Sequence, residues 1–151
     1  MPFISRTFVK AGMIYFVLSL IAGVLLEIDS LSVPALMPLF WHMLMVGWIT
    51  QIIMGVSVWM FPGRNREEGF WNQQWNWLTL IFLNAGLVLR LIAEPAIGYS
   101  EMKIWPVLLV GSAILQVAAG VTYVVEMWPR IMSKKQQRKK RKRRRKRSQQ
   151  K

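Results

Sequence analysis

The sequence predicts an all-α membrane protein: a bundle of four transmembrane helices, with both termini in the cytoplasm and a disordered basic C-terminal tail. Of its 151 residues, 54% are hydrophobic. Four apolar stretches are long enough to cross a hydrocarbon core about 30 Å thick, which takes about 20 residues of helix. We expect helices over about 8–26, 34–61, 71–93 and 104–128. None of these stretches alternates polar and apolar residues, so transmembrane β-strands are not indicated.

Each stretch has almost no charge in its interior. Arg6 and Lys10 stand at the start of the first, as they would in a signal peptide, but no small-x-small cleavage site follows it, and we expect a retained helix. The second contains a single ionisable residue, His42. The third has Arg90 near its end, and the fourth begins after Lys103.

The charges of the connecting segments predict the orientation. Segment 63–69, between the second and third helices, contains two arginines, and two more basic residues precede the first helix. The connections after the first and third helices contain four acidic residues and one lysine. Basic residues gather on the cytoplasmic side of short loops. We therefore expect both termini in the cytoplasm, in the inner (plasma) membrane of a bacterium.

Residues 1–132 form the predicted membrane domain, and residues 133–151 form the tail. The tail contains thirteen basic residues and no acidic one, so it accounts for the whole net charge of +13. Such a run repels itself and buries nothing, which predicts disorder. We expect the tail to contact anionic lipid headgroups, with an acidic protein partner as the alternative. Binding to nucleic acid is less expected, because no aromatic residue interrupts the basic run to stack on bases.

Three amides lie deep in the predicted helices: Gln51, Asn84 and Gln116. Inside a membrane such groups usually hydrogen-bond to a neighbouring helix, for about 0.6 kcal/mol each. A helix surrounded by lipid would leave them without partners. They therefore predict that the four helices pack as a bundle.

His42 and Arg90 are the candidate site residues. At about 1.5 Å of rise per residue, the predicted orientation places both in the outer third of the bilayer, where they could face one another. An ionisable residue within a membrane is by default a functional candidate. The structural alternatives are an imidazole bonded to one backbone carbonyl, and an arginine that extends to the outer headgroups.

The chemistry considered for His42 is ligation of haem iron, which accepts a neutral imidazole nitrogen. The ring needs flat apolar walls, and Gly47 and Gly55 could let it approach the second helix. Arg90 would pair with a propionate, held in place by Glu94 one turn later. The two glycines are equally typical of close contacts between helices.

A resemblance bears on this choice. The stretch His42-Met43-Leu44-Met45-Val46-Gly47-Trp48, followed by Gln51, Gly55, Trp59 and Phe61-Pro62, is similar to the histidine-bearing helices of the cbb-type haem–copper oxidase catalytic subunit and of NnrS-like membrane proteins. The fourth helix resembles other helices of that group more weakly. The resemblance implies a small membrane subunit that binds one b-type haem and takes part in respiratory electron transfer.

The chain also departs from that group. The resembled catalytic subunits have more helices and several histidines, which hold a low-spin haem, a high-spin haem and a copper, whereas this chain has one histidine. It is therefore not a complete oxidase by itself. A haem on His42 would take its second ligand from a methionine, from His42 of a second copy, or from another protein. The alternative function is a non-enzymatic scaffold or accessory subunit, and both readings imply a homo-oligomer or a larger membrane complex.

The predicted orientation can be tested with introduced thiols, because the chain contains no cysteine. Cysteines placed at Ser32 and Ser100 should react with a membrane-impermeant reagent added outside intact cells. A cysteine at Asn65 should react only after the cells are opened. The reverse pattern would invert the topology and move His42 to the cytoplasmic side.

Overall fold

The computed structural model describes residues 1–28, 35–61, 71–99 and 102–131. Within these ranges the chain is helical and contains no strand, and four helices are long and apolar enough to span a membrane. The predicted tail lies outside the described residues. The elements are α1 (Phe3–Leu26), α2 (Leu36–Trp41), a π-helical stretch (His42–Thr50), α3 (Gln51–Met60), α4 (Trp71–Tyr99), α5 (Ile104–Met127) and a 3₁₀ turn (Trp128–Arg130).

The helix bounds agree with the sequence prediction except at two ends. α1 begins at Phe3 rather than at residue 8, so the turn that carries Arg6 is helical. α4 continues to Tyr99 rather than ending at residue 93, and it passes through Pro95. A proline within a helix removes one backbone hydrogen bond. Only one turn of α4 follows Pro95, so the loss falls near the helix end.

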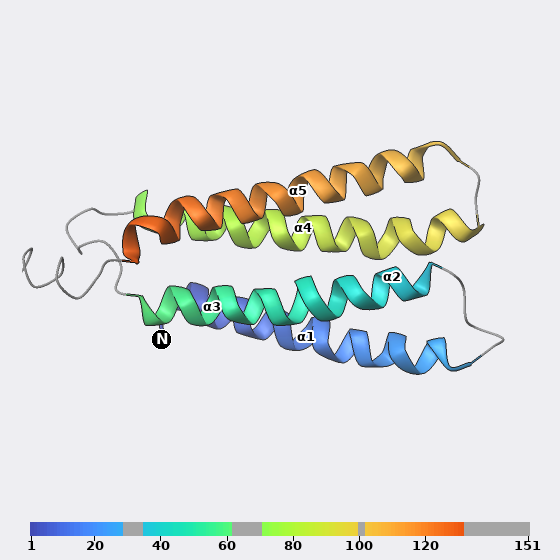
Figure 1. The fold of residues 1–151 in the computed structure, drawn as a ribbon, viewed down its shortest axis with the longest axis horizontal. Helices are drawn as coiled ribbons and strands as arrows, with labels where there is room; N and C mark the ends of the chain where they lie inside the picture. The colour runs from blue at the N-terminus through green and yellow to red at the C-terminus, as the bar shows by residue number, and fades with distance from the viewer. Residues whose placement is uncertain (29–34, 62–70, 100–101, 132–151) are drawn as a thin grey trace, which may run out of the picture.

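The spans form two antiparallel hairpins (Figure 1). One consists of α1 and the continuous rod made by α2, the π-helical stretch and α3, and the other consists of α4 and α5. Contacts within each hairpin are more extensive than contacts between them. We call the end that carries Phe3 and Met127 the terminal end, and the opposite end, with Leu36 and Tyr99, the far end.

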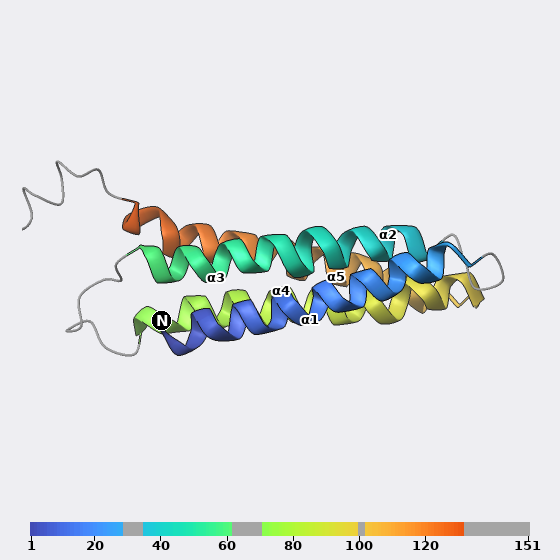
Figure 2. The ribbon, with the colours of Figure 1, turned by 90° about the horizontal axis from the view of Figure 1, so that it is seen from below.

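The first hairpin lies in front of the second in the view from below (Figure 2), and the two meet chiefly where α4 contacts α2 and the π-helical stretch, with fewer contacts between α4 and α1. At the terminal end, the Ser57 hydroxyl lies 2.7 Å from the Tyr123 hydroxyl. The Phe3 and Trp77 rings lie 6.1 Å apart there. The four spans therefore form a bundle, as the deep amides predicted.

Glycines mark the closest approach of α1 to its hairpin partner. A β-carbon on Gly47 would stand 2.7 Å from the Tyr15 ring, and one on Gly55 would stand 2.7 Å from the Phe8 β-carbon. Both distances are shorter than carbon atoms tolerate. Of the two roles considered for these glycines, the structure shows the contact between helices. They bring the backbones together, as small residues do in membrane bundles.

The exterior of the bundle is apolar. Every span exposes large aliphatic side chains, such as Ile14, Ile53, Ile81 and Ile114. Exposed tryptophans stand near the helix ends, with Trp59 and Trp128 at the terminal end and Trp41 toward the far end. This distribution is typical of a protein whose sides face lipid and whose ends face the two interfaces.

The interior is mixed, with ten polar or charged residues among the buried residues of the described ranges. Gln51, fully buried, donates to the Asn84 side chain at 3.3 Å and so joins the two hairpins. Gln116 donates instead to Ser112 of its own helix. Within the second hairpin, the Thr79 and Thr122 hydroxyls lie 2.9 Å apart.

The glycine contacts make a stability prediction. Gly47→Ala and Gly55→Ala should each lower the free energy of unfolding by about 1–3 kcal/mol, because the added methyl group forces α1 away. Gly120→Ala is the matched control, since no atom lies within 4 Å of a β-carbon there. It should be neutral or stabilising by up to about 1 kcal/mol. Unfolding in mixed detergent–SDS micelles measures all three, and equal effects at the three sites would contradict the packing.

Candidate functional site

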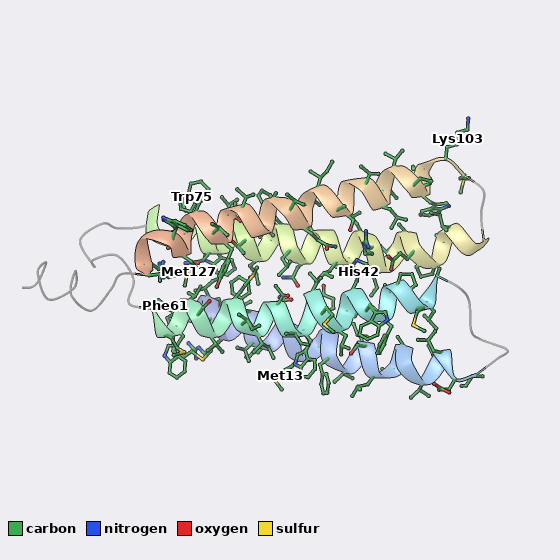
Figure 3. All side chains as sticks on the ribbon, viewed as in Figure 1. Met13, His42, Phe61, Trp75, Lys103 and Met127 are labelled. Carbon is green, nitrogen blue, oxygen red and sulfur yellow. The ribbon has the colours of Figure 1, made fainter. Side chains whose placement is uncertain are left out.

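The candidate site is a cluster of His42, Arg90 and Glu94 between the two hairpins, in the half of the bundle nearer the far end. His42 is the first residue of the π-helical stretch, and its side chain lies between the hairpins (Figure 3). Arg90 and Glu94 stand one turn apart on α4. The structure thus brings together the two residues that the sequence placed at the same depth. π-Helical segments are rare and often occur at functional sites.

The contacts of His42 define its tautomer. Nδ1 lies 2.7 Å from the Pro38 carbonyl oxygen, one turn earlier. Arg90 Nη1 lies 2.5 Å from Nε2 and 3.2 Å from Nδ1. A carbonyl only accepts and a guanidinium only donates. The neutral imidazole therefore carries its proton on Nδ1 and donates it to Pro38, while Nε2 accepts from Arg90.

Glu94 completes the cluster. Its Oε1 lies 3.2 Å from Arg90 Nη1, as the spacing of one helical turn predicted, and 3.7 Å from His42 Nδ1. The Glu94 side chain is almost entirely buried, at 7% exposed. Its Oε2 is inaccessible and has no hydrogen-bond partner. The pair with Arg90 is therefore what compensates the burial of this carboxylate.

α5 supports the arginine from the other side. Arg90 Nε donates to the Ser112 hydroxyl at 3.4 Å, and that hydroxyl donates to the Gly86 carbonyl at 2.7 Å. α5 can come this close because residue 86 has no side chain: a β-carbon there would stand 3.0 Å from the Ser112 carbonyl oxygen. Arg90 thus bonds to three side chains within the bundle, and the alternative in which it extends to the headgroups is not what the structure shows.

The arrangement can be compared with the needs of a haem. An iron ligand must offer an accessible nitrogen lone pair, whereas Arg90 Nη1 lies only 2.5 Å from His42 Nε2, where its positive charge and N–H groups oppose a metal cation. Gly47 and Gly55, the expected approach to the helix, are covered by Tyr15 and Phe8. Within this cluster, the buried polar atom without a hydrogen-bond partner is Glu94 Oε2, a carboxylate oxygen that would repel a propionate. As arranged in this structure, the residues do not fit a haem.

A second buried ion pair lies at the terminal end, outside this cluster. Arg130, in the 3₁₀ turn, pairs with Glu126 at the end of α5, and both side chains are buried. Neither residue was a sequence candidate. The spacing of one helical turn was the available signal, since it lets opposite charges meet. The pair fixes the 3₁₀ turn against the end of α5.

Sequence reasoning found His42, Arg90 and Glu94 but missed two of their partners. The Pro38 acceptor is a backbone carbonyl, which every residue has, so the residue type does not indicate it. Ser112 is a common residue in membrane helices, and it becomes a partner of Arg90 only because α4 and α5 are neighbours. Gly86 was the one visible signal of that close approach.

Comparisons with known proteins do not extend this description: no family model matches the chain, and no curated protein or solved structure is significantly similar to it. The function must therefore be argued from the site itself.

The burial of Glu94 makes the second stability prediction. Arg90→Leu should destabilise the bundle by about 3–5 kcal/mol, because it leaves a buried carboxylate without its pair. The double variant Arg90→Leu/Glu94→Leu should recover most of this loss, since no charge then remains to be compensated. Mixed-micelle unfolding of both variants and of Glu94→Leu closes a double-mutant cycle. Additive losses would mean that the two side chains do not interact.

Proposed function

We propose that the chain is a small integral membrane subunit without chemistry of its own, a scaffold or accessory component of a larger membrane complex. The observation that carries this proposal is that His42, Arg90 and Glu94 bond to one another rather than to a ligand site. These ionisable groups are engaged with one another and with α5, and they tie one hairpin to the other. Charged groups inside a membrane bundle are stabilised by pairing with one another, as Arg90 and Glu94 do here.

The rest of the chain suits such a role. The loop charges support an orientation with both termini in the cytoplasm, in the inner (plasma) membrane of a bacterium. The basic tail would then lie against the anionic cytoplasmic leaflet, where each lysine or arginine contributes about 1 kcal/mol of binding. The tail would bind the headgroups at the cytoplasmic surface. The apolar sides of the bundle would then remain free to contact lipid or other subunits.

A second candidate is the haem-binding subunit suggested by the resemblance. One observation favours it: His42 and Arg90 lie together, as an iron ligand and a propionate partner would. Binding would require Arg90 to release Nε2 and the hairpins to separate. The second axial ligand would come from a methionine, from His42 of a second copy or from a partner subunit.

An absorbance spectrum separates the two candidates. The proposed accessory subunit, purified from a haem-replete host, should be colourless. A Soret band with reducible α bands, lost in His42→Ala, would establish the haem subunit instead. In the accessory subunit, His42→Ala should lower stability by about 1–3 kcal/mol, because Arg90 and Pro38 lose a hydrogen-bond partner.

A further inference from the structure

The single histidine can either accept a hydrogen bond from Arg90 or ligate iron through the same nitrogen, but it cannot do both. A nitrogen lone pair that accepts from a guanidinium is not available to a metal, so a ligand role and the observed contacts exclude each other. We infer that His42 acts as a hydrogen-bond clasp for Arg90 and not as an iron ligand, although its helix resembles helices that bind haem. This inference deepens the proposed function. It rests on that proposal, in which the subunit carries no haem.

The first argument is that the Arg90 guanidinium needs hydrogen-bond acceptors. A guanidinium has five N–H donors, and each donor inside a membrane needs an acceptor within the protein. The side chain of Arg90 is 16% exposed. Glu94 Oε1 and Ser112 Oγ, on α4 and α5, are two acceptors. His42 Nε2 is the acceptor contributed by the other hairpin.

The second argument is that the imidazole is fixed at both nitrogens. Nδ1 is held by the Pro38 carbonyl of its own helix, which leaves Nε2 to point away from that helix toward α4. Only a side chain with a donor at one end and an acceptor at the other meets both partners. Neutral histidine has this pattern, and so does glutamine.

The third argument is the position of the contact between the hairpins. Side-chain hydrogen bonds join the hairpins at three depths in the described part of the chain. They are Ser57 with Tyr123 near the terminal end, Gln51 with Asn84 in the middle, and His42 with Arg90 toward the far end. Because charged donors make stronger hydrogen bonds than neutral ones, the clasp should set the spacing of the hairpins toward the far end.

The wild-type protein provides a direct test through its only imidazole. Nitrogen NMR of protein labelled with ¹⁵N-histidine, in lipid at neutral pH, should show one residue with a protonated Nδ1 and an unprotonated, hydrogen-bonded Nε2. A protonated Nε2 in a colourless preparation would overturn the clasp and leave the accessory function standing. Loss of the signal to a bound paramagnetic iron would overturn both.

Three substitutions at His42 separate a clasp from an iron ligand. His42→Gln keeps an acceptor and a donor, His42→Leu keeps neither, and His42→Met keeps a possible axial ligand but a poor acceptor. The clasp predicts that the Gln variant matches the wild type while the Met and Leu variants share one defect. An iron ligand predicts that the Met variant retains haem while the Gln and Leu variants lose it.

The distance between the hairpins distinguishes the clasp from a role of His42 within its own helix, because only the clasp predicts that this distance changes when His42 is replaced. The chain contains no cysteine, so spin labels at Met37→Cys and Ile97→Cys, both exposed and on different hairpins, report one distance. The wild type and His42→Gln should give the same narrow distribution, and His42→Leu and His42→Met should give a broader one. Labels at Ile97→Cys and Val107→Cys, within one hairpin, are the control. An unchanged distance between the hairpins in His42→Leu would overturn the inference.

Discussion

The structure depends on one constraint: a charged group inside a membrane bundle needs a partner within the protein, because lipid supplies none. Arg90 shows how far the constraint reaches. Its guanidinium draws an imidazole from one hairpin, a carboxylate from its own helix and a hydroxyl from α5. Each of these groups needs a defined position, so one side chain fixes the relative placement of three spans.

Apolar packing alone would not fix that placement. Lipid chains are as apolar as leucine, so burying a leucine between membrane helices supplies little driving force. The fold uses two other devices. Glycines let α1 approach the π-helical stretch and α3 within the first hairpin, and polar side chains join the first hairpin to the second. The first device gives close packing, and the second gives specificity of partner and depth.

The sequence was sufficient to predict the four helices, because length and hydropathy alone determine which segments can span a bilayer. It was also sufficient to place His42 and Arg90 at one depth, since the rise of a helix converts residue number into height. It could not choose between the two roles of Gly47, because contact with a helix and contact with a cofactor require the same absence of a side chain. Tyr15, the residue that covers Gly47, becomes visible only once the neighbouring helix is known.

The same limit explains why the sequence did not identify Pro38 and Ser112 as partners and why it misplaced the end of α4. A backbone acceptor has no sequence signature, and a serine is a partner only where another helix brings a donor to it. The sequence prediction ended the third span at residue 93, before Glu94. Glu94 lies instead inside the bundle, where Arg90 compensates its charge.

The division into two hairpins has a consequence for how the chain is made. Synthesis proceeds from the N-terminus, so the hairpin that carries His42 leaves the ribosome before α4 does. When Arg90 reaches the membrane, the acceptor it needs from the other hairpin is already in place there. The order of the residues along the chain thus shortens the time for which a charged side chain must wait in the bilayer without its full set of acceptors.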